Sequence, residues 1–167
     1  MEKINLAKAS LITSPNPVAL VCINKPDGEI NVTAVSWYTY LSYNPSMIAY
    51  AMNKDSYGGE LVRENKKVII TIPSENIKEI VVGCGMYSGR EIDKIRNLGI
   101  KMQSIPTSDI KIPLHSAAAI QCNLKEFIET GDHYLYICNV EEVYADYKEK
   151  PVFAWEGYSK IAAAKEM

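Results

Sequence analysis

The feature that most constrains the fold of this chain is a series of short apolar runs rich in β-branched residues, each ended by a turn or a proline. Residues 17–24 (PVALVCIN) form the first run, and residues 30–37 (INVTAVSW) form the second. The segment between them contains Pro26, Asp27 and Gly28, which favour a tight turn. Runs of this composition are typical of buried strands, so the two runs predict an antiparallel hairpin.

The same pattern continues along the chain. Residues 46–52 (SMIAYAM) and 66–72 (KKVIITI) predict two further strands, and Pro73 stops the second of them. Residues 116–130 (SAAAIQCNLKEFIET) fit a helix or a strand by composition. We expect a strand, because residues 131–145 continue with an alternating, β-rich pattern after a Gly-Asp turn and would pair with it as a second hairpin.

Three segments between these runs have helical patterns instead. Residues 55–65 and 74–85 each begin with a residue that can cap a helix, and in the second the apolar residues repeat at helical spacing. Residues 90–100 predict one or two further helical turns, ended by Gly99. Many strands with two or three inserted helices predict a mainly β protein, an antiparallel barrel in a single domain that spans residues 1–167.

The composition fits one globular domain and argues against several classes of protein. The chain has 167 residues and a formal net charge of −2, without the basic excess that nucleic-acid-binding proteins usually show. No window reaches the ~18 apolar residues that a membrane span needs. The N-terminus has neither the apolar core of a secretory signal nor a transit-peptide bias. We therefore expect a cytoplasmic protein that binds neither nucleic acid nor membrane.

The four cysteines and two histidines do not predict a metal site, since no two cysteines are spaced as CxxC. Each cysteine lies in an apolar run, which is typical of reduced core thiols, although Cys84 lies between two glycines. The chain also lacks a GxGxxG motif after a strand, a P-loop and a GxSxG motif. Any use of a nicotinamide cofactor would therefore not depend on a Rossmann domain.

A polar row interrupts the otherwise apolar strand at residues 30–37. Asn31, Thr33 and Ser36 are polar, and a buried polar group without a partner costs roughly 1–3 kcal/mol. The row fits a solvated strand face about as well as a set of donors that face a ligand, and both interpretations stay open on the pattern alone.

The segment NKDSYGG, residues 53–59, has the composition of an anion-binding turn. Its Gly-Gly pair allows close approach of the backbone, and the helix that begins near Ser56 offers N-terminal amides. Lys54 adds a positive charge. An ordinary turn with a capped helix explains the same residues.

The segment MYSGREIDK, residues 86–94, is a second candidate for an anion site. Ser88 and Gly89 precede a predicted helix start, and the spacing of Arg90 and Lys94 predicts that both lie on one helical face. The alternative is a helix surface with mixed charges.

Two further motifs contain aromatic or titratable side chains. His133 follows a Gly-Asp turn, where its ring is either structural or stands at the rim of a pocket beside Asp132, whose charge favours the imidazolium. The motif WEGYSK places Trp155 and Tyr158 around a glycine, where they cover the core or lie across a subunit interface. His115, in a loop flanked by prolines, has no obvious partner in the sequence.

Taken together, these motifs resemble the flavin reductase-like FMN-binding family, which includes flavoredoxin-type electron carriers and short-chain NAD(P)H:flavin reductases. The resemblance rests on an ordered series that runs from Pro17 to Tyr158: PVALV, N.TAVSW, K.SY..EL, a strand ending in IP, SGRE.DK, GDH and a final GY. It implies a Greek-key split β-barrel, a homodimer, and FMN bound near the dimer interface.

The resemblance also implies which residues meet the cofactor. His133 matches the histidine placed near the flavin ring and any nicotinamide stacked on it, which makes it the candidate catalytic residue. Many family members have Arg or Thr in the phosphate segment, where this chain has Tyr57 and a Gly-Gly pair. The residues that match the family's cofactor-binding segments are Asn31, Val32, Thr33, Ala34, Val35, Ser36, Lys54, Ser56, Tyr57, Ser88, Gly89, Arg90 and Lys94.

Two functions follow from the resemblance. The first is an oxidoreductase that passes electrons from NAD(P)H through FMN to a flavin or protein acceptor. The second is a flavoredoxin-like carrier that holds FMN and takes electrons from a protein partner without NAD(P)H activity of its own. A barrel that binds nucleic acid without flavin is disfavoured despite the 11 tyrosines, because the charge is slightly acidic and the aromatic residues are not interleaved with Lys or Arg.

Overall fold

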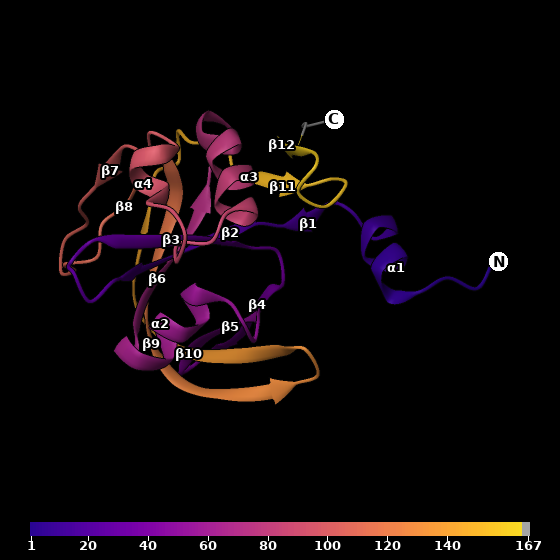
Figure 1. Ribbon diagram of the computed structural model, residues 1–167, viewed down its shortest axis with the longest axis horizontal. Helices are drawn as coiled ribbons and strands as arrows, with labels where there is room; N and C mark the ends of the chain where they lie inside the picture. Colours follow the sequence, from indigo (N-terminus) through magenta and orange to yellow (C-terminus); the bar gives the residue numbers. More distant parts are fainter. Residues whose placement is uncertain (165–167) are drawn as a thin grey trace.

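The computed structural model describes residues 1–164 and is built around a seven-stranded antiparallel sheet (Figure 1). A three-stranded sheet and a two-stranded sheet accompany it. The elements in chain order are α1 (Leu6–Ile12), β1 (Asn16–Pro17), β2 (Ala19–Asn24), β3 (Ile30–Val35), β4 (Tyr38–Tyr43), β5 (Ser46–Asn53), α2 (Tyr57–Asn65), β6 (Lys67–Pro73), the 3-10 turn η1 (Glu75–Ile77), α3 (Lys78–Met86), α4 (Lys94–Asn97), β7 (Met102–Gln103), β8 (Ile112–Pro113), β9 (Ser116–Thr130), β10 (His133–Ala145), β11 (Val152–Ala154) and β12 (Ile161–Ala163).

The large sheet has the strand order β3-β2-β6-β9-β10-β5-β4, so β3 and β4 are its edges. Both predicted hairpins are confirmed: Ala19 of β2 lies opposite Val35 of β3, and Thr130 of β9 lies opposite His133 of β10. β3 and β5 contact each other although they lie near opposite ends of the strand order, which shows that the sheet curls back on itself. The predicted mainly β, antiparallel class is therefore correct.

Apolar residues are buried on both faces of the sheet, which explains why the first run of the sequence is continuously apolar rather than alternating. Leu20 and Cys22 of β2 belong to one core cluster, which also contains Val81 of α3. Val21 and Ile23 belong to the other, on the opposite face of the strand. Cys22, Cys122 and Cys138 are free and buried, as predicted, and so is Cys84, which the sequence left open.

The predicted helices form, but the third is shorter than the pattern suggests. Ser56 caps α2, and Ser74 caps the turn η1 that leads into α3. Before α4 the chain turns, because the Ser88 hydroxyl accepts a hydrogen bond from the Arg90 amide at 3.2 Å, and the helix begins only at Lys94. The prediction that Arg90 and Lys94 share one helical face is therefore wrong.

The helix α1 and the strand β4 were not predicted, and neither were the short strands β7, β8, β11 and β12. β4 is an edge strand whose alternation (YTYLSY) is weak because its side chains lie largely at the surface. α1 has no buried residue and stands apart from the sheets near the N-terminus (Figure 1). None of the helices within residues 1–164 is long and apolar enough to cross a membrane.

Candidate functional site

Two cavities meet at the edge strand β3 and form one cleft. They share Thr33, Asn53 and Ser56, which come from β3, the end of β5 and the start of α2. The first, here called the aromatic cavity, has a volume of about 370 Å³ and is lined by Ser10, Thr33, Ala34, Val35, Ser36, Trp37, Ala51, Met52, Asn53, Ser56, His133 and Tyr158. The second, the lysine cavity, has a volume of about 310 Å³ and is lined by Thr33, Asn53, Asp55, Ser56, Tyr57, Gly58, Cys84, Gly85, Met86, Tyr87, Ser88, Gly89 and Lys94.

Three rings stand in the wall of the aromatic cavity. Trp37 and His133 pack against each other with ring centroids 4.9 Å apart and an angle of 38° between the planes. Tyr158 reaches the cavity from the loop between β11 and β12, and burial raises the pKa of its hydroxyl against the opposing effect of a hydrogen bond with Ser36. His133 Nδ1 lies 2.7 Å from Asp132 Oδ1. These rings make a slot that suits a planar ligand.

Lys94 is the lysine for which the cavity is named, and the lining also includes one acidic residue, Asp55. The Lys94 side chain is buried, with 4% of the residue exposed, and its ammonium donates to the carbonyl of Val32 at 2.9 Å and to that of Cys84 at 3.0 Å. An ammonium has three N–H donors, so one remains for a ligand in the cavity. Burial lowers the pKa of Lys94, while the nearby Cys84 thiol opposes that shift. An anion in the cavity would favour the charged lysine.

The N-terminus of α2 supplies further donors to the same cavity. Ser56 caps the helix by accepting a hydrogen bond from the Gly59 amide at 3.3 Å. The amides of Tyr57 and Gly58 lie in the first turn, where helix amides have no intrahelical acceptor, and both residues line the cavity. Free amides and the positive end of a helix favour an anion such as a phosphate.

Two glycines allow the segments of the lysine cavity to approach each other. A Cβ atom on Gly58 would lie 2.5 Å from Thr33 Oγ1, and a Cβ atom on Gly89 would overlap Asn31 Oδ1. Any larger residue would therefore push α2 or the turn at Gly89 away from β3. The sequence indicated the Gly-Gly pair but not its contact with the polar row.

Two of the three polar side chains in the row on β3 face the cleft, and the third lies behind the cleft wall. Thr33 and Ser36 line the cleft, as do Ala34 and Val35, so this part of the predicted site is brought together. Asn31 lies behind the wall and donates to Thr33 Oγ1 at 3.0 Å. Val32 does not line either cavity, but its carbonyl holds Lys94. Both residues therefore support the site from behind.

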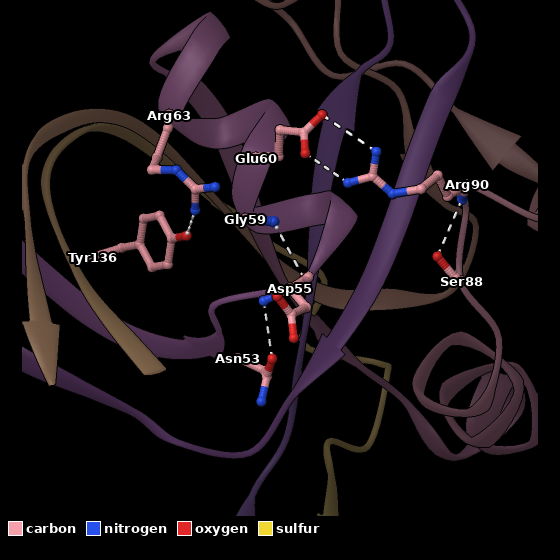
Figure 2. Close-up of polar contacts among 9 residues, drawn as sticks. Asn53, Asp55, Gly59, Glu60, Arg63, Ser88, Arg90 and Tyr136 are labelled. Atoms are coloured by element: carbon pink, nitrogen blue, oxygen red, sulfur yellow. Dashed lines mark hydrogen bonds and ion pairs between the residues drawn. The ribbon is translucent and has the colours of Figure 1, made fainter. Parts of the chain in front are cut away.

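The structure does not bring Lys54 and Arg90 into the cavity walls. The Lys54 ammonium pairs with Glu129 of β9. The Arg90 guanidinium donates to Glu60 of α2 at 2.6 Å, and Figure 2 shows that it points toward this carboxylate. Both partners are distant in sequence, so the spacing of the motifs gave no sign of them.

Figure 2 also shows the opposite side of α2, where Arg63 donates to Tyr136 at 2.5 Å. Arg63 further lies over the ring of Tyr134, 4.9 Å from its centroid. Neither Arg63 nor the two tyrosines line the cleft, so this cluster anchors α2 to β10.

The sequence analysis missed Ser10, Trp37 and Asn53 as cleft residues, and it left Tyr158 as a cover of the core or of an interface. Trp37 ends the run that contains the polar row and Asn53 begins the NKDSYGG segment, so both lie inside motifs that the sequence analysis had singled out. Ser10 and Tyr158 lie in the wall through the tertiary fold and have no local signal.

The second histidine has a partner, contrary to the expectation from its loop. His115 Nδ1 lies 2.7 Å from Glu149 Oε1, and Glu149 also accepts a hydrogen bond from Asn76 at 2.9 Å. Hydrogen bonds from Ser74 and then His115 hold the pKa of Glu149 below its usual value. The carboxylate connects three segments outside the cleft, which makes this a structural contact.

The sequence of the chain matches the flavin reductase like domain over residues 11–162. The chain belongs to this family. A flavin reductase of Pseudomonas putida is 26% identical over 159 residues, which cover 93% of this chain and 89% of that protein. An uncharacterised protein of Archaeoglobus fulgidus is 24% identical over 115 residues, and the chain covers 64% of its length.

Solved structures of other family members share the fold. A flavoredoxin of Desulfovibrio vulgaris superposes with a TM-score of 0.84 at 25% identity, covering 99% of this chain and 95% of that one. An FMN-binding protein of Thermus thermophilus superposes with a TM-score of 0.81 at 22% identity, covering 93% and 89%. The flavin reductase-like fold implied by the sequence motifs is thereby confirmed.

Proposed function

We propose that this chain is an FMN-binding oxidoreductase that takes electrons from NAD(P)H and passes them through bound FMN to a flavin or protein acceptor. The observation that carries the proposal is the buried ammonium of Lys94, with one N–H free toward the lysine cavity and the α2 amides beside it. The lysine cavity suits a phosphate, and the adjoining aromatic cavity suits a planar ring. A ligand that carries both groups would fit the whole cleft.

The phosphate of FMN would lie in the lysine cavity. Lys94 Nζ offers a charged donor, and the amides of Tyr57 and Gly58 offer neutral donors at the positive end of α2. Ser56 caps this helix and Ser88 lies across the cavity. Lys54 and Arg90, which pair with carboxylates, are not needed for this assignment.

The isoalloxazine ring would lie in the aromatic cavity against β3. The Val32 carbonyl accepts a hydrogen bond from Lys94, so it faces the open edge of β3 and not the neighbouring strand β2. The N–H and C=O of one residue in an antiparallel strand point to the same side, and that side repeats every second residue. The amide of Ala34 therefore also points away from β2 on this edge strand, toward the polar edge of a bound ring.

The protein's contribution to electron transfer is position and environment. FMN supplies the hydride chemistry when it is bound, and hydride transfer between stacked rings needs no general acid or base. The backbone of β3 would align the polar edge of the ring, and Trp37 and Tyr158 would form the walls of the slot. Lys94 would hold the phosphate at the other end of the cofactor. This division of roles agrees with the small number of titratable groups in the cleft.

We also propose a homodimer in the cytoplasm. Trp37, which precedes the edge strand β4, is 51% exposed, and Tyr40, Leu41 and Tyr43 of β4 are 59%, 47% and 94% exposed. An apolar surface of this kind is typical of an interface, and a second copy would cover it. The four free cysteines support a reducing compartment.

A flavoredoxin-like carrier is the second candidate, because the same cleft would hold FMN without a nicotinamide. Steady-state oxidation of NADH and of NADPH by the FMN-loaded protein, with excess free FMN as acceptor, separates the two. Turnover with either nicotinamide supports the reductase. A protein that binds FMN, does not oxidise either nicotinamide, and is reduced by a chemical donor would be a carrier.

A further inference from the structure

One titratable pair at the edge of the cleft, Asp132 and His133, is not required for hydride transfer between stacked rings. His133 and Asp132 meet at the start of β10, with 2.7 Å between Nδ1 and Oδ1. The histidine side chain is 22% exposed, whereas that of Asp132 is 84% exposed. The imidazole thus lies in the wall of the aromatic cavity while its carboxylate partner lies outside, in solvent.

The ring of His133 is held from two sides. Trp37 packs on it at 4.9 Å, and the bond to Asp132 determines which nitrogen is left for a ligand. Nε2 has no hydrogen-bond partner among residues 1–164. When both ring nitrogens carry a proton, Nδ1 donates to Asp132 and Nε2 has a proton that it can donate to a ligand. The hydrogen bond with His133 in turn lowers the pKa of Asp132, so the partner stays charged.

The rest of the cavity wall indicates what would accept this proton. Within the described chain, the residues that line the aromatic cavity include no lysine and no arginine, so His133 is the one side chain in this wall that can carry a positive charge. Trp37 and Tyr158 instead offer ring faces to a planar molecule. A neutral planar compound that gains negative charge on oxygen as it is reduced matches this set of groups.

We propose that the Asp132–His133 pair makes the cleft a reductase for small planar conjugated carbonyl compounds, of which a quinone is the simplest. The inference rests on the proposed binding of FMN in the same cleft. Nε2–H of His133 would donate to the carbonyl oxygen of the acceptor, Asp132 would hold the imidazolium, and Trp37 would hold the ring plane.

FMN, if bound here and reduced, would supply one hydride to the quinone, that is two electrons and one hydrogen nucleus, and would be oxidised by that loss. The quinone becomes a hydroquinone anion with the charge on oxygen. The imidazolium of His133 gives its Nε2 proton to that oxygen, yielding the neutral hydroquinone, and solvent reprotonates the histidine. NAD(P)H or a chemical donor reduces FMN again.

Reoxidation of the FMN-loaded protein tests this directly. The holoprotein is reduced with dithionite without oxygen and then mixed with 1,4-benzoquinone or with ferricyanide, which accepts electrons without a proton. His133→Phe keeps a ring against Trp37 but removes the donor, and we expect it to slow the quinone reaction about 10- to 100-fold relative to the ferricyanide reaction. His133→Asn, which restores an N–H donor, should recover part of that ratio.

The matched control is His115→Ala, which removes the other histidine, outside the cleft, and should leave the ratio unchanged. If His133→Phe slows both acceptors equally, or neither, the inference is wrong while the binding of FMN still stands. If the wild-type protein does not bind FMN, the proposed function and the inference both fall.

Binding of a ligand that cannot be reduced gives a second readout. Phenol can accept a hydrogen bond at its oxygen and can stack on a ring, and its binding should quench Trp37, which packs on His133. A Trp155→Phe background removes the other tryptophan signal. We expect His133→Phe to weaken phenol at least about fivefold, which corresponds to the loss of roughly one hydrogen bond. Equal affinities in both proteins would contradict the assigned donor.

Discussion

Replacing Lys94 by methionine removes the ammonium but keeps an unbranched apolar stem, and so tests the phosphate site. In the structure the ammonium has two carbonyl partners, at 2.9 and 3.0 Å, and one free donor. A hydrogen bond to a charged group contributes about 1.5–3 kcal/mol. Loss of one such bond to phosphate should therefore raise the dissociation constant of FMN about 10- to 150-fold. Riboflavin has no phosphate, so its affinity should change little.

The assay is titration of flavin fluorescence with FMN and with riboflavin, on the wild-type protein and on Lys94→Met. The variant also leaves the Val32 and Cys84 carbonyls without this donor, which should lower the free energy of unfolding by roughly 1–3 kcal/mol for each group that finds no other partner. The affinity of Lys94→Met for riboflavin shows whether the loss of the two carbonyl hydrogen bonds distorts the cleft.

Arg90→Met is the matched control. The Arg90 guanidinium pairs with Glu60 at the surface and does not line the lysine cavity, so we expect FMN affinity to change less than about twofold and stability to change little. An equal loss of FMN and riboflavin affinity in Lys94→Met would refute the assignment of Lys94 to the phosphate. So would a larger FMN-specific loss in Arg90→Met.

Three other outcomes are expected. Gly89→Ala should lower both the melting temperature and FMN affinity, because its Cβ would overlap Asn31 Oδ1; unchanged melting and binding would show that the turn moves freely. Hydrogen bonds from Ser74 and His115 lower the folded-state pKa of Glu149, so its contribution is complete above the unfolded pKa and is lost as pH falls through the lower, folded value. Thermal melts from about pH 7 to about pH 3 should therefore show a steeper loss of stability for the wild-type protein than for Glu149→Gln, and parallel curves would contradict this. Light scattering of the FMN-loaded protein at micromolar concentration should give the mass of a dimer, and a monomer would count against the proposed interface.

The strands were predictable where burial on one or both faces leaves a strong pattern. β2 is buried on both faces and reads as an unbroken apolar run, and β9 and β10 were recognised through the turn that joins them. β4 has no such pattern, because an exposed edge strand does not have to alternate. The same reasoning explains why α1, which buries none of its residues, was not predicted.

Within the site, short-range features were predicted better than long side chains. Ser56 was identified as a possible cap from its position before α2, and Thr33 and Ser36 line the cleft from the predicted strand. Lys54 and Arg90 have long, flexible side chains, so their direction depends on carboxylates that only the tertiary fold brings near. A spacing rule that assumed a continuous helix could not show these partners.

The contribution of Tyr158 and Ser10 to the cleft could not be derived from local patterns either. The position of Tyr158 depends on the pairing of β12 with β11. The position of Ser10 depends on how α1 lies relative to the strands that line the cleft. Both placements are long-range results of folding, whereas hydrophobic periodicity reports only which face of an element is buried.

Titration of the purified protein with FMN tests whether this cleft binds the cofactor. We expect either a yellow protein with flavin absorption or an apoprotein that quenches the fluorescence of added FMN and saturates at one FMN per chain, with riboflavin bound more weakly. Lys94 and the α2 amides provide the reason for that preference. A colourless protein that leaves flavin fluorescence unchanged at micromolar FMN would contradict the claim.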